Sequence, residues 1–169
     1  MSYKVEEGTI LSKGENVIIG HGTVIGAIPL MFKKGTHDLK FDGTRKVVIE
    51  DDVAIGNNVT IMGGHYGETI IKKGAKIWDG SIIGHDCIIG EYTAMVTNVT
   101  INGEVNVGKW CMIGSGVTIK PKINIGNFVQ IGVGAVVLGD VPDRAVIVGG
   151  QDPPRVIRVN EWNPKNLES

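Results

Sequence analysis

Aromatic side chains, cysteine and net charge are all scarce in this chain. Phe, Trp and Tyr make up 5% of its 169 residues, which argues against an ordinary β-sandwich with an aromatic-rich core. The two cysteines are too few for a disulfide framework. The 17 basic and 18 acidic residues nearly cancel, so the electrostatic signature of a nucleic-acid-binding protein is missing.

Long apolar runs are missing as well. No segment approaches the roughly 20 apolar residues that span a bilayer, and residues 1–10 do not have the layout of a secretory signal. We therefore expect no membrane association and a cytoplasmic location with reduced thiols. Glycine, by contrast, is abundant: 25 of the 169 residues are glycine, about twice the usual share of about 7%.

The dominant pattern is a repeat of six residues. From Ile71 onward an aliphatic residue recurs at every sixth position, and a small or β-branched residue follows four positions after each. A period of six fits neither an amphipathic helix nor simple strand alternation. The aliphatic positions are Ile71, Ile77, Ile83, Ile89, Met95, Ile101, Val107, Ile113, Ile119, Ile125, Ile131 and Val137.

This repeat predicts an all-β fold, a parallel β-helix in the form of a triangular prism. Each hexad supplies a short strand with two inward side chains, followed by a turn that glycine facilitates. Three hexads close one coil of 18 residues, and coils stack about 4.8 Å apart through parallel ladder hydrogen bonds. A narrow interior of this kind explains why aromatic residues are few.

Two breaks interrupt the repeat and predict one or two projecting loops. Residues 27–46 leave the register and are expected to form a loop insertion, and a shorter break lies near residues 63–69. The β-helix domain is therefore predicted to cover residues 1–145. Residues 146–169, which include three prolines, are predicted to be a tail that caps an exposed end of the solenoid.

His85 and Gly103 are 18 residues apart, so successive coils should place them at the same edge of the prism. His85 occupies an outward position in its hexad, where an accessible imidazole can take a proton from an attacking amine or hydroxyl. The Gly103 amide could donate a hydrogen bond to a thioester oxygen one coil further along. On the residues alone, an incidental surface histidine is the simpler interpretation.

The sequence around His85 reads Ile-Gly-His-Asp-Cys-Ile-Ile-Gly (83–90) and resembles the catalytic-histidine hexads of the hexapeptide-repeat acyltransferases. Within that superfamily it is most similar to sugar-nucleotide N-acetyltransferases of the bacillosamine and sialic-acid type. Residues 47–103 also resemble the prism domain of UDP-3-O-acylglucosamine N-acyltransferases. The resemblance implies a left-handed β-helix, a homotrimer, and acetyl transfer from acetyl-CoA to an amino sugar carried on a nucleotide.

The resemblance also implies roles for individual residues. His85 would be the general base, Asp86 would orient it, and Gly103 would polarise the thioester; Asp79 is an alternative orienting carboxylate. Residues 133–143 are similar to the coil along which the pantetheine arm of acetyl-CoA runs in this superfamily. The expected donor contacts are Ser115, Lys120, Val133, Ala135 and Arg155, with Lys122 and Arg158 as further basic candidates for the CoA phosphates.

Two tryptophans and two further histidines have less specific interpretations. Trp78 and Trp110 occupy outward positions and are expected at a seam between subunits or along the donor groove. His37 and His65 lie in the two register breaks and are candidates for the acceptor pocket, although ordinary loop histidines are the simpler interpretation. No histidine pair has the spacing of a β-helical carbonic anhydrase, so no metal is expected.

Two other functions stay open at this point. One is O-acetylation of a sugar or small alcohol, and the other is a non-catalytic β-helix that serves as an assembly module. The acceptor sugar and its nucleotide are not specified by any motif in the chain.

Overall fold

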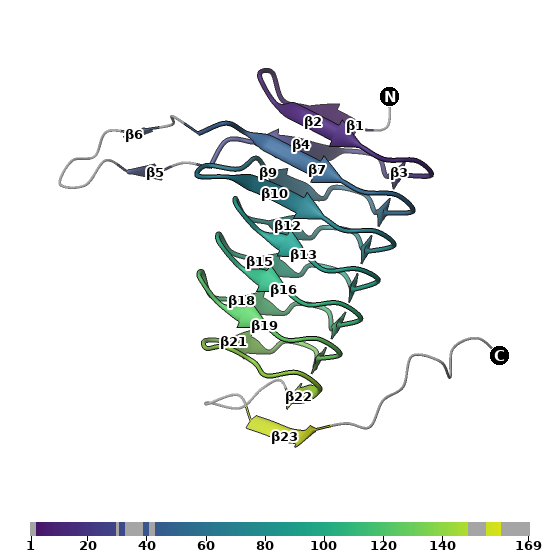
Figure 1. The fold of residues 1–169 in the computed structure, drawn as a ribbon, viewed down its shortest axis with the longest axis vertical. Helices are drawn as coiled ribbons and strands as arrows, with labels where there is room; N and C mark the ends of the chain where they lie inside the picture. The colour runs from purple at the N-terminus through teal and green to yellow at the C-terminus, as the bar shows by residue number, and fades with distance from the viewer. Residues whose placement is uncertain (1–2, 30, 33–38, 41–42, 149–154, 160–169) are drawn as a thin grey trace.

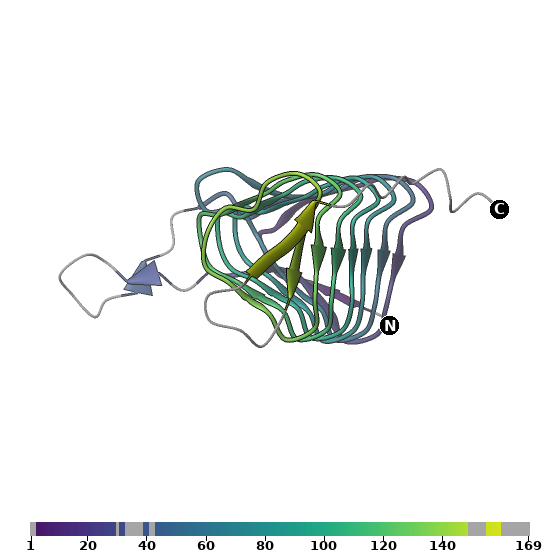
Figure 2. The same cartoon turned by 90° about the horizontal axis from the view of Figure 1, so that it is seen from below.

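The computed structural model describes residues 3–29, 31–32, 39–40, 43–148 and 155–159. The described residues are all-β and contain no helix, as the hexad repeat predicts. Their strands wind as a parallel β-helix whose coils stack along one axis (Figure 1). Seen from one end, the coils superimpose as a roughly triangular outline (Figure 2).

Three sheets form the faces of this prism, and we call them A, B and C. Sheet A contains β1 (Tyr3–Val5), β4 (Thr23–Ala27), β9 (Thr60–Met62), β12 (Ile82–Ile83), β15 (Thr100–Ile101), β18 (Thr118–Ile119) and β21 (Val136–Val137). Sheet B contains β2 (Ile10–Lys13), β7 (Lys46–Ile49), β10 (Glu68–Ile71), β13 (Ile88–Ile89), β16 (Asn106–Val107) and β19 (Asn124–Ile125). Sheet C contains β3 (Ile18–Ile19), β8 (Ala54–Ile55), β11 (Lys76–Ile77), β14 (Ala94–Met95), β17 (Met112–Ile113), β20 (Gln130–Ile131), β22 (Ala145–Val148) and β23 (Arg155–Val159).

The core consists of the two inward positions of every hexad. All twelve aliphatic residues of the repeat are buried, with at most 3% of each exposed. The small residues four positions later are buried too, including Cys87 and Cys111. Burial on this scale supplies the main stabilisation of the prism, at about 25 cal/mol for each Å² of apolar surface removed from water.

The turns differ from the expectation in one respect. The glycine that follows the aliphatic residue, such as Gly84, does not have a positive φ. It is required because a Cβ there would lie 2.6 Å from the backbone nitrogen of Gly103 on the next coil. The left-handed conformation falls instead two residues later, for example at Asp86 with a φ of 57°.

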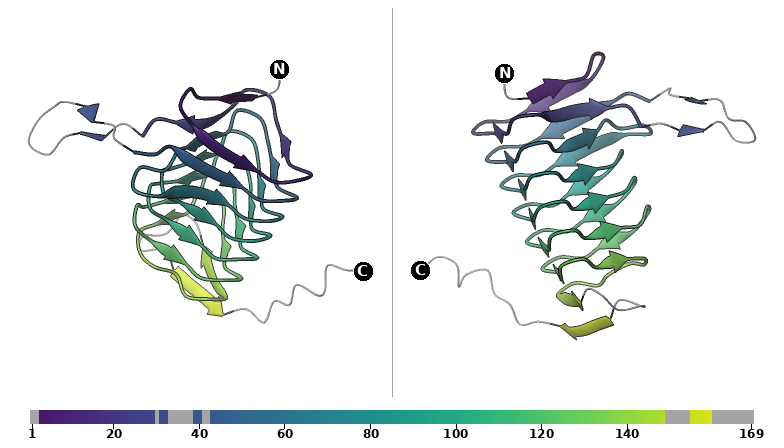
Figure 3. Two further views of the ribbon diagram at one scale, coloured as in Figure 1. Left: turned by 45° about the horizontal axis from the view of Figure 1, so that its top comes forward. Right: turned by 180° about the vertical axis from the view of Figure 1, so that it is seen from behind.

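Both register breaks lie at the edge where sheet A turns into sheet B, which we call edge A–B. The longer break, between β4 and β7, contains the antiparallel pair β5 (Met31–Phe32) and β6 (Leu39–Lys40), which projects away from the prism (Figures 1 and 3). The shorter break connects β9 to β10. After both breaks the ladder resumes in phase, with partner residues such as Ile83 and Ile101 spaced by 18.

At the C-terminal end, β22 continues sheet C across the predicted boundary at residue 145, and Ile147 is buried within it. β23 then pairs antiparallel with β22 and lies across the end of the coils (Figure 2). The rest of the predicted capping tail, residues 149–154 and 160–169, lies outside the described residues. Nowhere in the described ranges is there a helix of the length and apolarity that crossing a bilayer requires.

Candidate active site

His85 lies at edge A–B, on the turn between β12 and β13. Its carbonyl oxygen accepts a hydrogen bond of 2.8 Å from the Glu104 amide on the next coil. A Cβ placed on Gly103 would lie 2.4 Å from His85 Nε2. The structure therefore brings His85 and Gly103 together, and only glycine leaves room for the imidazole at that position.

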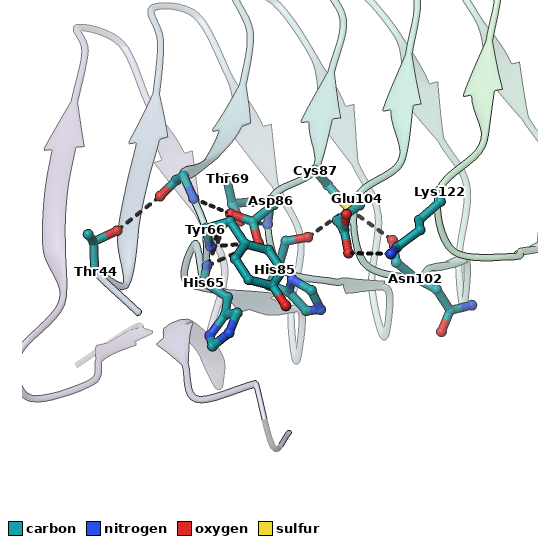
Figure 4. A network of polar contacts seen from close by, with 11 residues as sticks. Thr44, His65, Tyr66, Thr69, His85, Asp86, Cys87, Asn102, Glu104 and Lys122 are labelled. Carbon is teal, nitrogen blue, oxygen red and sulfur yellow. Dashed lines mark hydrogen bonds and ion pairs between the residues drawn. The ribbon is translucent and has the colours of Figure 1, made fainter. Parts of the chain in front are cut away.

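Asp86 contacts the other ring nitrogen of His85, Nδ1. Its Oδ2 lies 2.8 Å from His85 Nδ1, and the two side chains are largely buried, with 11% and 14% exposed (Figure 4). The same carboxylate accepts hydrogen bonds from the backbone amides of His65, Tyr66 and Gly67, at 3.0, 3.1 and 2.7 Å. Asp86 thus joins the imidazole to the loop between β9 and β10.

The charge of Asp86 follows from these contacts. Partial burial raises the pKa of the carboxyl group, but the hydrogen bonds from His85 and the three loop amides outweigh it and keep the pKa below its ordinary value. Asp86 is therefore ionised at neutral pH and can only accept hydrogen bonds. His85 must donate from Nδ1, which leaves the lone pair of Nε2 beside Gly103.

The alternative orienting carboxylate, Asp79, lies at the edge between sheets C and A. Its oxygens accept hydrogen bonds from the Asn57 amide at 2.7 Å and from Asn57 Nδ2 at 3.1 Å. These bonds lower the pKa of Asp79, and they tie one coil to the next. Asp86, rather than Asp79, is the carboxylate in contact with His85.

Tyr66 is a neighbour of His85 that the sequence analysis did not single out. Its ring centroid lies 6.5 Å from that of His85 and 4.3 Å from that of His65, and the residue is 70% exposed. His65, a candidate for the acceptor pocket, lies 6.0 Å from His85 between ring centroids. The sequence feature that could have pointed to Tyr66 is the shorter register break, because this break falls at the same edge one coil before His85.

The insertion returns to the prism beside the same loop. Thr44 Oγ1 donates a hydrogen bond of 2.9 Å to the Gly67 carbonyl oxygen (Figure 4). His37, the other histidine proposed for the acceptor pocket, lies outside the described residues. Edge A–B therefore carries, in successive coils, the end of the insertion, the loop with Tyr66, His85 and Gly103.

The expected donor residues fall at several places in one chain. Ser115 and Val133 stack at the edge between sheets C and A, where the Gly134 amide donates to the Ser115 carbonyl oxygen at 2.9 Å. Lys120 is exposed at the end of β18, near edge A–B. These positions border sheet A from both sides, so a single chain does not gather them into one cluster.

Ala135 and Arg155 differ from the other donor candidates. The Ala135 side chain is buried in the core, and its carbonyl oxygen accepts the Thr118 amide at 2.9 Å. Arg155 lies in β23, where its backbone pairs with Val148; its side chain lies outside the described residues, as does that of Arg158.

Trp78 and Trp110 are at different edges of the prism. Trp78 is exposed where sheet C turns into sheet A. Trp110 stacks on Tyr92, with ring centroids 4.6 Å apart, at the edge between sheets B and C. This pair lines a groove of about 220 Å³ over sheet C, together with Met112 and Gln130. Trp110 therefore has a stacking partner within its own chain, which the sequence pattern did not reveal.

Neither thiol chemistry nor a metal centre is built into the described residues. Burial raises the pKa of the Cys87 thiol to about 12, so this group stays protonated at neutral pH. In the parts of the chain that the structure describes, no group of three His, Cys, Asp or Glu side chains is placed to hold a metal ion.

Comparison with known proteins places this chain beside acyltransferases. No protein-family model matches it. It is 47% identical over 70 residues to the UDP-3-O-acylglucosamine N-acyltransferase of Helicobacter hepaticus. That alignment covers 41% of this chain and 21% of that enzyme. This chain is 38% identical over 100 residues to the enzyme of the same name from Helicobacter pylori, covering 57% and 29%. The chain thus spans less than a third of the length of these curated relatives.

Solved structures extend the similarity to nearly the whole chain. The UDP-N-acetylglucosamine acyltransferase of Bacteroides fragilis has a TM-score of 0.72 at 25% identity, over 99% of this chain and 68% of that one. The Arabidopsis enzyme of that name has a TM-score of 0.70 at 25% identity, over 87% and 53%. The fold is therefore the left-handed β-helix of the hexapeptide-repeat acyltransferases, which confirms the resemblance seen in the sequence.

Proposed function

We propose that this protein transfers an acetyl group from acetyl-CoA to the amine of an amino sugar carried on a nucleotide. The observation that carries the proposal is the arrangement around His85, with ionised Asp86 at Nδ1 and Gly103 beside Nε2. The similarity to UDP-3-O-acylglucosamine N-acyltransferases supports an amine on a sugar as the acceptor.

In this proposal His85 is the general base. Nε2 takes a proton from the amine as the amine nitrogen attacks the thioester carbonyl carbon. The Asp86 carboxylate, 2.8 Å from Nδ1, stabilises the imidazolium that forms. Because Asp86 is itself fixed by three backbone amides, the imidazole is held in one orientation before the substrate arrives.

Gly103 is the proposed oxyanion donor. Among the described residues, no hydrogen bond uses its N–H group, so that group is available to the oxygen of the tetrahedral intermediate. Collapse of the intermediate keeps the new C–N bond and breaks the C–S bond. The proton on His85 Nε2 then passes to the departing CoA thiolate, which restores the neutral base.

Donor binding is the part of the proposal that involves a second copy of the chain. We propose a homotrimer of parallel prisms in which acetyl-CoA lies between adjacent copies. His85 and Lys120 would come from one copy, and Ser115 and Val133 would come from the next. The positions of these residues at the two borders of sheet A support such an arrangement.

The direct test is a screen for thioester consumption. The full chain is incubated with acetyl-CoA and a panel of UDP- and dTDP-linked sugars that carry either an amine or only hydroxyl groups. We expect CoA release with one or more amino sugars, and a loss of at least about 100-fold in rate for His85→Ala. Lys109→Ala, which changes an exposed residue at the edge between sheets B and C, away from both edges used in the proposal, is the control and should keep the wild-type rate.

Three results would contradict the proposal in different ways. Turnover only with hydroxy sugars would indicate O-acetylation, and turnover only with acyl groups on a carrier protein would change the donor. A chain that neither consumes the thioester nor binds acetyl-CoA in a calorimetric titration would be a non-catalytic assembly module.

A further inference from the structure

Tyr66 is an exposed aromatic residue that the proposed reaction does not use. It follows His65 in the loop between β9 and β10, and its ring lies 6.5 Å from His85 between centroids (Figure 4). The residue is 70% exposed, so its ring is open to solvent beside the proposed base. A single exposed tyrosine is ordinary on a protein surface, so the argument depends on how this one is held.

The backbone of Tyr66 is fixed by the same carboxylate that orients the base. Its amide donates to both oxygens of Asp86, each at 3.1 Å, and the flanking amides of His65 and Gly67 donate to that carboxylate as well. The Gly67 carbonyl oxygen in turn accepts a hydrogen bond from Thr44. The loop is therefore anchored on both sides, and little further ordering is needed for its ring to receive a ligand.

The position of Tyr66 decides which part of the acceptor it can reach. The reacting amine must come within about 2.6–3.2 Å of His85 Nε2. The sugar ring that carries this amine then occupies the space next to the imidazole, whereas the nucleobase is separated from it by two phosphates. The group within reach of a ring 6.5 Å from His85 is therefore the pyranose.

We propose that Tyr66 is the platform on which the pyranose ring of the acceptor packs while its amine faces His85; this rests on the proposed function. The C–H groups on a pyranose face are weakly positive, and the face of an aromatic ring is negative, so the two surfaces attract each other as they exclude water. Asp86 then has two tasks, since it orients the base and places the platform at a fixed position relative to it.

The test separates sugar binding from nucleotide binding. Calorimetry on the full chain compares UDP and dTDP with UDP- and dTDP-linked hexoses that carry an amine at C2, C3 or C4. The wild-type protein should bind at least one of these amino sugars more tightly than the corresponding free nucleotide. Tyr66→Ala should weaken that binding about tenfold, the size of one lost ring-face contact, while affinity for the free nucleotide stays unchanged.

Two further variants make the result specific. Tyr66→Phe keeps the ring face and should retain the affinity for the sugar. Tyr92→Ala removes a tyrosine at another edge of the prism and should leave both affinities unchanged. In kinetics, Tyr66→Ala should raise KM for the acceptor about tenfold and leave KM for acetyl-CoA as it is.

The platform is overturned if Tyr66→Ala binds the nucleotide-linked amino sugar as tightly as the wild type, or if it loses affinity for the free nucleotide to the same extent. It is equally overturned if Tyr66→Phe behaves like Tyr66→Ala, or if neither UDP-linked nor dTDP-linked amino sugars bind more tightly than the corresponding free nucleotide. Failure of the proposed function is a different result, because the wild-type protein would then transfer no acetyl group to any amino sugar.

Discussion

At the scale of single residues, the candidate site depends on the absence of a side chain at Gly103. Gly103 does not have a positive φ, so its backbone would accept alanine, but the new Cβ would lie 2.4 Å from His85 Nε2. The imidazole would have to leave its position beside the proposed oxyanion donor. Gly103→Ala should therefore lower kcat by at least about tenfold, since a displaced base loses much of its catalytic contribution.

Gly139 offers a matched control for this substitution. It occupies the same hexad position two coils later, and a Cβ there meets nothing within 4 Å. Because residues 133–143 are expected to lie along the donor, the comparison is made at saturating acetyl-CoA, where Gly139→Ala should keep the wild-type kcat and the wild-type midpoint of thermal unfolding. Equal activity of the two alanine variants would show that the imidazole does not need the space above Gly103.

The lowered pKa of Asp86 makes a prediction about stability and pH. An aspartate whose pKa in the folded protein lies below its unfolded value of about 3.9 stabilises the fold above that pH. The stabilisation is lost as pH falls through the folded pKa. In urea unfolding between pH 5 and pH 3, the wild-type protein should therefore lose more stability than Asp86→Asn at the same protein concentration.

Asp79→Asn is the comparison for this experiment. The Asp79 pKa is also lowered, by its bonds to Asn57, so this variant should also lose less stability in acid than the wild type. It should keep its turnover, whereas Asp86→Asn should not, because only Asp86 contacts His85. Acid unfolding of Asp86→Asn that parallels the wild-type curve would contradict the stabilising role assigned to the hydrogen bonds of Asp86.

At the scale of elements, buried hydroxyl groups join neighbouring coils. Thr93 occupies an inward position where its Oγ1 donates to the Gly108 carbonyl oxygen at 2.7 Å and accepts from the Cys111 amide at 3.0 Å. Thr93→Val keeps the shape but leaves both backbone groups without this partner. The free energy of unfolding should fall by about 1–3 kcal/mol.

The measurement is urea unfolding with Thr118→Val as the control. Thr118 lies on the outer face of β18, partly exposed, and its replacement should change stability by no more than about 0.5 kcal/mol. If Thr93→Val is as stable as Thr118→Val, the hydroxyl does not contribute to the stacking of coils.

The elements also show how far the sequence could be interpreted. The inward residues were predictable because the six-residue period determines which side chains face the core, and every one of the twelve aliphatic positions is buried. The turns were less predictable. Gly84 is needed because the next coil approaches its backbone closely. The left-handed conformation that glycine was expected to adopt occurs two residues later, at Asp86.

The candidate site was predictable in part for the same reason. The spacing of 18 placed His85 beside Gly103, but it contained no information about how the β9–β10 loop folds. Tyr66 was therefore missed, and the choice between Asp79 and Asp86 needed the actual hydrogen bonds. Breaks in a repeat have no periodic pattern, and their conformation depends on contacts such as those from Asp86 to the loop amides.

At the scale of the whole molecule, the proposed trimer gives a further prediction. Light scattering should give a mass of about three times the 18.1 kDa of one chain. Trp78 is exposed at the edge between sheets C and A, where the neighbouring copy would pack. Trp78→Glu should lower the mass toward that of one chain and abolish acetyl-CoA binding, because burying an unpaired charge is unfavourable.

Circular dichroism of Trp78→Glu would serve as the control, since an exposed position should tolerate the change without loss of β structure. A single-chain mass for an active wild-type protein would disprove the trimer while leaving the roles of His85 and Gly103 open to their own tests.

The way the ladder resumes after each interruption has a consequence for how such proteins diversify. Partner residues are 36 positions apart across the insertion and 22 apart across the shorter break, yet every strand returns to the same alignment. Residues inserted at edge A–B therefore leave the register of the strands on either side unchanged. If the proposed function holds, exchanging these two segments between related chains would change the acceptor side of the site while His85, Gly103 and the interior stay untouched.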